Sequence, residues 1–283
     1  MPLWAESRIH GDVYVRFGGR LSETYHRKVA WRRQPSLRMV VALLALFVFA
    51  PAEVRAQHND FGVWTTVGAE KDFGKKWSVG VEGEFRTRNN SKTADRWSFG
   101  VDGSYKIVDG LKLSAGYTLL YDNNEEKITY HEDGTYNNWR PSYWGLRHRF
   151  NVSLTGSLDV GRFKMSLRER WQFTYRPEKT TERYDFDNEW WEDDNVKSKR
   201  HHVLRSRLKV EYDIPKCKIE PYASAEFYNS WSLEKSRYIV GAEWKITEMH
   251  RVGLYYLYQD VNNDKDDDEP DEHILGLSYK IKL

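Results

Sequence analysis

Apolar and polar residues alternate with a period of two along almost the whole of residues 57–283. In the stretch 77–86, WSVGVEGEFR, one face carries Trp77, Val79 and Phe85, and the other carries Glu84 and Arg86. This alternation is typical of strands that separate two environments, and the three-to-four spacing of an amphipathic helix does not recur. The sequence therefore predicts an all-β chain.

The predicted strands are roughly 10 to 13 residues long, longer than strands in most soluble sheets. Their connections alternate between two kinds. Short turns are expected near positions 74, 109, 160, 216 and 248, and longer connections at 89–95, 122–143, 177–200, 232–236 and 260–271. Short turns on one rim and longer loops on the other are typical of outer-membrane barrels.

A soluble β-sandwich also alternates, and it is the competing interpretation. The membrane barrel is favoured by strand length, by the rim asymmetry, by an export signal, and by aromatic residues near the ends of the apolar faces. A charged lumen also explains why the mean hydropathy is as low as −0.78. The expected girdle residues are Trp77, Trp97, Tyr121, Trp171, Tyr175, Trp231 and Trp244.

We therefore predict a transmembrane antiparallel up-and-down β-barrel of about 10–12 strands. Ten strands follow Lys75, and segment 60–73 (DFGVWTTVGAEKDF) would be an eleventh that begins at the long-loop rim. Bacterial single-chain barrels have even strand numbers, so either one more strand is present and the number is twelve, which is favoured, or this segment lies in the lumen or on the rim. Residues 275, 277, 279, 281 and 283 continue the alternation to the carboxyl terminus and are expected to be read by the barrel-assembly machinery.

Residues 1–56 are expected to be a leader that ends in a secretory signal peptide. Basic residues precede an apolar run at 40–50, and small residues at Val54 and Ala56 precede Gln57. The simplest explanation of the long leader is that translation starts at Met39. An uncleaved anchor is the weaker alternative, because the run is shorter than a membrane span. The mature barrel is therefore expected to comprise residues 57–283, in a Gram-negative outer membrane.

The composition excludes several classes of function. The 44 basic and 42 acidic residues give a net charge of +2, which provides no basic field for nucleic acid. The single cysteine, Cys217, excludes an intrachain disulfide and a cysteine-rich zinc site. We expect no cofactor.

Three segments carry a family resemblance: DFGVWTTVGAEKDFGKKWSVGVEGEFRTR (60–88), LRHRFNVSLTGSLDVGRFKMSLRERWQF (146–173), and VGLYYLYQDV followed by HILGLSYKIKL (252–261 and 273–283). They resemble DUF2490, a family of uncharacterised porin-like outer-membrane barrels, over about residues 57–283. The resemblance implies a porin-like barrel, and it brings no active-site residues.

The polar faces of the predicted strands are rich in charge, and two interpretations stay open. Arginine and glutamate on neighbouring strands could form a structural ion-pair network. Alternatively, an arginine-rich wall could select anions in a narrow pore. The candidate lumen-lining residues are Glu82, Glu84, Arg86, Arg147, Arg149, Arg168, Arg170, Arg205, Arg207, Lys209 and Glu211.

Two polar residues fall on the predicted lipid side, His148 and Glu169. A charge at the middle of a bilayer costs about 2 to 4 kcal/mol. We therefore expect a β-bulge near Glu169, or a position close to a rim.

Two predicted loops, 177–202 and 262–273, are strongly acidic. Carboxylates suit calcium or magnesium, but neither run has the spacing of an EF-hand, so no metal site is predicted. The weak candidates for a cation are Asp266, Asp267 and Asp268. Trp190 and Trp191 could stack on sugar rings or pack against the rim.

The sequence contains no recognisable motif of catalytic residues. No GxSxG elbow is present, and His201 or His202 with Ser198 is the least poor combination. The chain is therefore predicted not to be an enzyme. A barrel lipase or acyltransferase is the weakest of the alternative functions. The preferred function is a narrow channel for small solutes or ions in outer-membrane lipid. The alternative is a plugged structural or surface-interaction barrel that acts through its acidic loops.

Overall fold

The computed structural model describes residues 60–262 and 271–283, and the expected leader lies outside these residues. The described chain is organised in strands. No helix within it is long and apolar enough to cross a membrane. The strands are β1 (Asp60–Phe73), β2 (Trp77–Arg88), β3 (Thr93–Val108), β4 (Leu111–Asn124), β5 (Lys127–Tyr130), β6 (Tyr136–Arg140), β7 (Tyr143–Val160), β8 (Phe163–Arg176), β9 (Lys179–Asp185), β10 (Trp190–Val196), β11 (Lys199–Tyr212), β12 (Ile219–Ser230), β13 (Ser232–Lys245), β14 (His250–Val261) and β15 (Glu272–Lys282).

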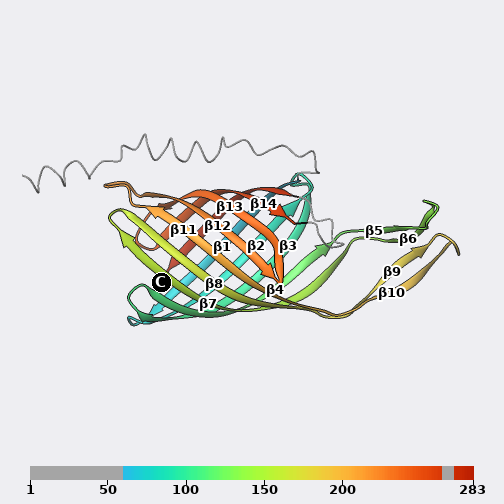
Figure 1. The fold of residues 1–283 in the computed structure, drawn as a ribbon, viewed down its shortest axis with the longest axis horizontal. Coiled ribbons are helices and arrows are strands. Elements are labelled where there is room, and N and C mark those ends of the chain that lie inside the picture. The colour runs from blue at the N-terminus through green and yellow to red at the C-terminus, as the bar shows by residue number, and fades with distance from the viewer. Residues whose placement is uncertain (1–59, 263–270) are drawn as a thin grey trace, which may run out of the picture. The chain divides into compact units, whose positions relative to one another are not determined.

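Eleven of these strands close into a barrel, in the order β1-β15-β14-β13-β12-β11-β8-β7-β4-β3-β2 (Figure 1). The predicted all-β barrel is thus confirmed, with a strand number inside the predicted range. The preference for twelve strands is wrong. An odd number closes because β1 pairs with β15 in parallel, while every other neighbouring pair in the barrel is antiparallel.

The two rims differ as the sequence predicts, with two exceptions, the first being that the predicted longer connection at 89–95 is only a short turn at 89–92, because β3 begins at Thr93. The turns β1–β2, β3–β4, β7–β8, β11–β12 and β13–β14 form one rim, here called the short-turn rim. The opposite end is the long-loop rim. There, β12 and β13 are separated by Trp231 alone, so the predicted connection at 232–236 is in fact part of β13.

The parallel seam between β1 and β15 is held by a small apolar cluster. Trp64 of β1, Ile274 of β15 and Leu257 of β14 are buried together, with Ile239 and Tyr255 packed against them. The register runs without interruption from Asp60 opposite Glu272 to Glu70 opposite Lys282. Burying three large side chains compensates for the weaker hydrogen-bond geometry of a parallel pair.

The outer surface of the barrel is apolar over a continuous band. Side chains such as Phe99 (57% exposed), Leu167 (52%) and Leu254 (52%) point away from the lumen, alternating with polar residues that point inward. The expected girdle residues Trp77, Trp97, Tyr121, Trp171 and Trp244 are also exposed, but Trp171 lies near the middle of β8 and not at a rim. A soluble protein would not leave such a band uncovered, whereas lipid would cover it.

The structure places both exceptional residues, His148 and Glu169, on the outer face. His148 lies toward the long-loop rim, where its Nδ1 is 2.8 Å from the Tyr117 hydroxyl and its ring stacks on Tyr175. Glu169 lies mid-strand between the exposed side chains of Leu167 and Trp171, and it accepts a 2.6 Å hydrogen bond from the Ser206 hydroxyl. The expected bulge is absent, because β8 pairs with both neighbours without a register shift.

The predicted connections at 122–143 and 177–200 contain four strands. These form a second sheet in the order β10-β9-β6-β5, which projects beyond the long-loop rim (Figure 1). β6 and β9 join the two hairpins through Asn138 opposite Asp185 and Trp139 opposite Tyr184. We call this the loop sheet.

Candidate functional site: the arginine cluster of the lumen

The predicted lumen residues occupy inward positions, alternating with exposed apolar side chains on the same strands. Most are half-buried and contact one another across the barrel interior. The arginines gather around three carboxylates, and we call this group the arginine cluster. It consists of Arg86, Arg96, Arg147, Arg149, Arg168, Arg170, Arg205, Arg207 and Arg237, with Glu84, Asp122 and Glu226.

Glu226 of β12 is the centre of the largest group of contacts, and its side chain is only 1% exposed. Its carboxylate accepts a 3.1 Å hydrogen bond from Arg205 Nε and lies 3.5 Å from nitrogens of Arg168 and Arg207. Three guanidinium groups therefore share one carboxylate. Their positive charges repel one another, so the carboxylate is essential to this arrangement.

Asp122 of β4 is a second centre. Its carboxylate forms ion pairs with Arg96 of β3 and, at 2.9 Å, with Arg147 of β7. The sequence analysis missed Asp122 because it placed this residue at the start of a loop. The alternation of Leu120, Asp122 and Asn124 with the outward Tyr121 is the signal that extends β4 through this residue.

Trp64 of β1 links two arginines from opposite sides of the seam. The Arg86 guanidinium lies 3.6 Å from the centre of its ring, and the Arg237 guanidinium lies 5.0 Å from it. Arg237 Nε also donates a 2.8 Å hydrogen bond to Gln259, and Arg237 Nη1 donates a 2.6 Å hydrogen bond to Tyr228. Such cation–π contacts are stronger where water is excluded. Neither Trp64 nor Arg237 was among the predicted lumen residues.

Three members of the cluster form no ion pair with any carboxylate in the described residues. Arg170 Nε donates a 2.8 Å hydrogen bond to the Ser153 hydroxyl, and Arg237 has the neutral partners given above. Arg149 has a buried Nε without a hydrogen-bond partner. The cluster therefore holds more guanidinium groups than its three carboxylates neutralise.

The remaining predicted residues lie apart from this cluster. Lys209 forms ion pairs with Glu211 and, at 3.5 Å, with Glu243, in the half of the barrel nearer the short-turn rim. Glu84 and Arg86, by contrast, belong to the cluster, where they pair with each other at 2.6 Å. Glu82 forms no ion pair with another described side chain.

The candidate catalytic and metal groups do not come together. His201 Nε2 is 3.2 Å from Glu234, and His202 packs on Trp171 and Phe173 at the outer surface, so neither histidine is positioned by Ser198. Within residues 60–262 and 271–283, no cluster of His, Cys, Asp and Glu could hold a metal ion. Asp266, Asp267 and Asp268 lie outside the described residues.

Comparison with protein families decides the relationship. The model of the family described as "Protein of unknown function (DUF2490)" matches residues 61–269. The chain belongs to the DUF2490 family. The match contains nine of the eleven barrel strands of this DUF2490 protein in full, β1 from its second residue, and the whole arginine cluster.

A search of curated proteins finds no match to this DUF2490 barrel. Among solved structures it is similar to the Beta domain of the Bordetella autotransporter Brka, at 12% identity and a TM-score of 0.46 over 72% of this chain and 79% of the other. It is also similar to the outer membrane protease OmpT from Escherichia coli, at 10% identity and a TM-score of 0.38 over 66% and 74% of the two chains.

Proposed function

We propose that this DUF2490 protein is a narrow, anion-preferring channel of the outer membrane, exported by its signal peptide and inserted by the barrel-assembly machinery through β15. The observation that carries the proposal is the excess of guanidinium groups over carboxylates in the arginine cluster of the lumen. Arg149, Arg170 and Arg237 contact no carboxylate in the described chain.

An excess of fixed positive charge in a narrow lumen lowers the energy of a passing anion and raises that of a cation. Low-dielectric walls concentrate this field, because little water and few salt ions screen it there. An eleven-stranded barrel lies between the eight-stranded barrels that side chains fill and the sixteen-stranded porins that hold a wide channel. Small inorganic anions and small carboxylates or phosphates fit such a passage best.

The carboxylates in the cluster give it a second role. Glu84, Asp122 and Glu226 hold six of the arginines in fixed positions. The remaining arginines are therefore presented on a rigid wall, and an anion can pass without reorganising it. The protein needs no catalytic residue for this function, and we propose that it is not an enzyme.

The test is single-channel recording of refolded residues 57–283 in a planar bilayer under a potassium chloride gradient. We expect discrete conductance steps and a reversal potential of the sign that chloride selectivity requires. Arg149→Met and Arg170→Met should each reduce the selectivity, because they remove charges that no carboxylate balances. Arg162→Met, in the exposed short turn between β7 and β8, is the matched control and should leave it unchanged.

If the folded barrel gives no conductance, the proposal of a channel is overturned and the plugged barrel is favoured. Steps with cation selectivity would overturn the role of the arginine excess. Folding is checked separately by the heat-dependent mobility of the barrel in detergent gels.

A further inference from the structure

The loop sheet has two chemically different faces. Residues opposite each other on paired strands lie on the same face, and neighbours along a strand lie on opposite faces. Ile128 is opposite Trp139, Trp139 is opposite Tyr184, and Tyr184 is opposite Trp191, so the four share one face. Trp190 is opposite Asp185 and therefore lies on the other face.

The first face carries a continuous row of aromatic rings, which we call the aromatic face. The ring centres of consecutive members lie between 5.1 and 5.6 Å apart. Nothing in the described chain covers these rings, although an apolar sheet face is normally buried against another layer. The row is formed by Tyr130, Tyr136, Phe186, Tyr184, Trp191 and Trp139.

The charges of the loop sheet are distributed unequally. On the face opposite the aromatic row, Arg140 pairs with Asp194 at 3.4 Å, and Arg183 Nε donates a 2.9 Å hydrogen bond to Glu192. These basic groups are therefore already neutralised on that face.

Among the described residues, the aromatic face itself carries acidic groups and no basic one. Glu182 and Asp193 are exposed there, opposite each other, without an ion pair to any described residue. Glu126 lies beside the row, where it accepts a 3.1 Å hydrogen bond from Trp139 Nε1. The aromatic face is thus both apolar and negatively charged.

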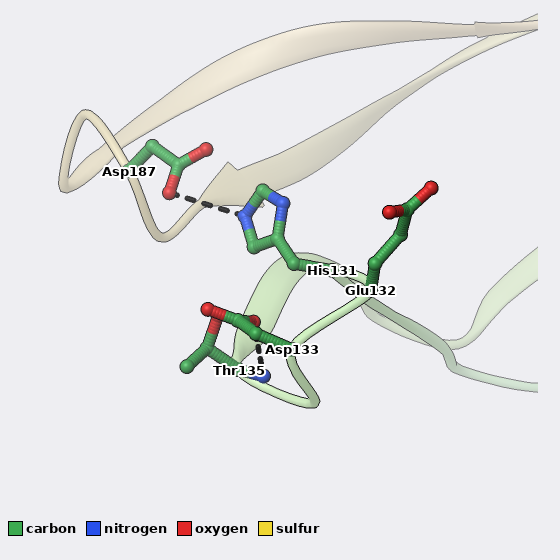
Figure 2. Close-up of a pocket in the computed structure, with 5 residues that line it drawn as sticks. All are labelled: His131, Glu132, Asp133, Thr135 and Asp187. Carbon is green, nitrogen blue, oxygen red and sulfur yellow. Dashed lines mark hydrogen bonds and ion pairs between the residues drawn. The ribbon is translucent and has the colours of Figure 1, made fainter.

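The tip of the loop sheet extends this negative charge. An open cleft of about 550 Å³ is lined by His131, Glu132, Asp133, Thr135 and Asp187. Figure 2 shows the cleft between the two hairpin turns, where His131 Nε2 lies 3.2 Å from Asp187 and joins them. Hydrogen bonds from Thr135 to Asp133 lower the pKa of that carboxyl, so it stays charged at neutral pH.

We propose that the aromatic face binds a cationic, amphipathic polypeptide segment of a partner. Lysine or arginine side chains of the segment would lie over the exposed rings and beside Glu182 and Asp193, and its apolar side chains would cover the rest of the row. Charge complementarity selects this occupant, since the face presents carboxylates without competing basic groups.

The ring geometry disfavours a flat sugar chain. A flat chain stacks on rings that lie in one common plane, but Tyr184 is inclined by 85° to Phe186 and by 63° to Trp191. Edges and faces of the rings are presented together. Such an arrangement suits the insertion of separate side chains from a polypeptide.

The experiment uses refolded residues 57–283 in zwitterionic detergent micelles and a fluorescent synthetic peptide of about ten alternating lysine and leucine residues, the length of one long strand. Binding is measured by anisotropy, with empty micelles as the blank. Trp191→Ala should weaken binding about tenfold, which corresponds to ~1.4 kcal/mol. Trp190→Ala is the matched control, because the two tryptophans are adjacent, similarly exposed (60% and 50%) and on opposite faces.

The double variant Glu182→Gln/Asp193→Asn should also weaken binding of the peptide, because it removes the two exposed charges. Raising the salt concentration from about 50 to about 500 mM should weaken binding to the wild-type protein, because exposed charges are screened. Equal losses in the Trp191→Ala and Trp190→Ala variants, or no loss in either, would overturn the proposal. Equal binding of a peptide with glutamate in place of lysine would also overturn it. Tighter binding of a neutral oligosaccharide, or self-association that blocks the peptide, would assign the face to a sugar or to a second copy of the chain.

Discussion

Replacing Glu226 with glutamine isolates the role of the carboxylate at the centre of the arginine cluster. The substitution keeps the shape of the side chain but removes the charge that Arg168, Arg205 and Arg207 share. At an effective dielectric constant of about 20, each contact of 3.1 to 3.5 Å contributes roughly 5 kcal/mol of Coulomb energy. Desolvation of the charges opposes most of this gain.

Breaking a buried ion pair by removing one partner typically costs about 3 to 5 kcal/mol, and three guanidinium groups lose their partner here. We expect Glu226→Gln to lower the free energy of unfolding by about 4 kcal/mol. The measurement is urea-induced unfolding of the barrel in phospholipid vesicles, followed by tryptophan fluorescence.

Arg149 supplies a matched control of the opposite kind. It has no carboxylate partner in the described chain, and its buried Nε is unsatisfied. Arg149→Met should therefore leave the free energy of unfolding unchanged within about 1 kcal/mol, or raise it. If Glu226→Gln were as stable as the wild type, or if Arg149→Met were the more damaging of the two, the electrostatic account of the cluster would be refuted.

Three further predictions concern other parts of the molecule. Glu169→Leu should raise the stability of the barrel in vesicles by about 1 kcal/mol, because it removes a carboxylate from the apolar band; a loss would show that the contact with Ser206 is stabilising. Gly62→Ala should lower the urea midpoint and reduce the free energy of unfolding by about 1 to 3 kcal/mol, because the alanine Cβ would lie 2.6 Å from the Thr87 carbonyl oxygen. An unchanged midpoint would contradict the close spacing of the strands beside the seam. Hydrogen bonds from the Asn188 side chain and backbone lower the pKa of Asp185, so its contribution to the turn is present above about pH 3.9 and is lost as the pH falls through the lowered pKa. Amide hydrogen exchange of the turn, relative to the intrinsic rate, should accelerate at low pH in the wild type but not in Asp185→Ala.

The sequence predicts the two faces of the barrel strands well, because alternation is a local property. Glu84 and Arg86 follow directly from their spacing to Trp77 and Val79, and the structure places all four on the expected sides. The same argument placed Glu169 on the outer face. The expectation of a bulge or a rim position at Glu169, which rests on the cost of a charge in the bilayer, is wrong, because β8 keeps its alternation without a register shift and Glu169 lies mid-strand.

Strand number and partner identity could not be read from alternation. Segment 60–73 has the same pattern whether it pairs in parallel or antiparallel, and only its contact with β15, more than 200 positions away, decides between them. Likewise, no local feature shows that Asp122 meets Arg96 and Arg147. The loop sheet was missed because its strands, such as β5 (Lys127–Tyr130), are too short for a clear periodic signal.

The parallel seam also limits how this chain can be rearranged. In a barrel with an even number of strands, the first strand begins and the last strand ends on the same rim, so a short linker can join these two ends and new ends can be opened elsewhere. Here β1 begins at the long-loop rim and β15 ends at the short-turn rim. A circular permutant of this protein would need a linker that crosses the bilayer, roughly 9 to 11 residues in β conformation. Such a linker would itself be a twelfth strand, inserted between β1 and β15, and it would separate Trp64 from Ile274.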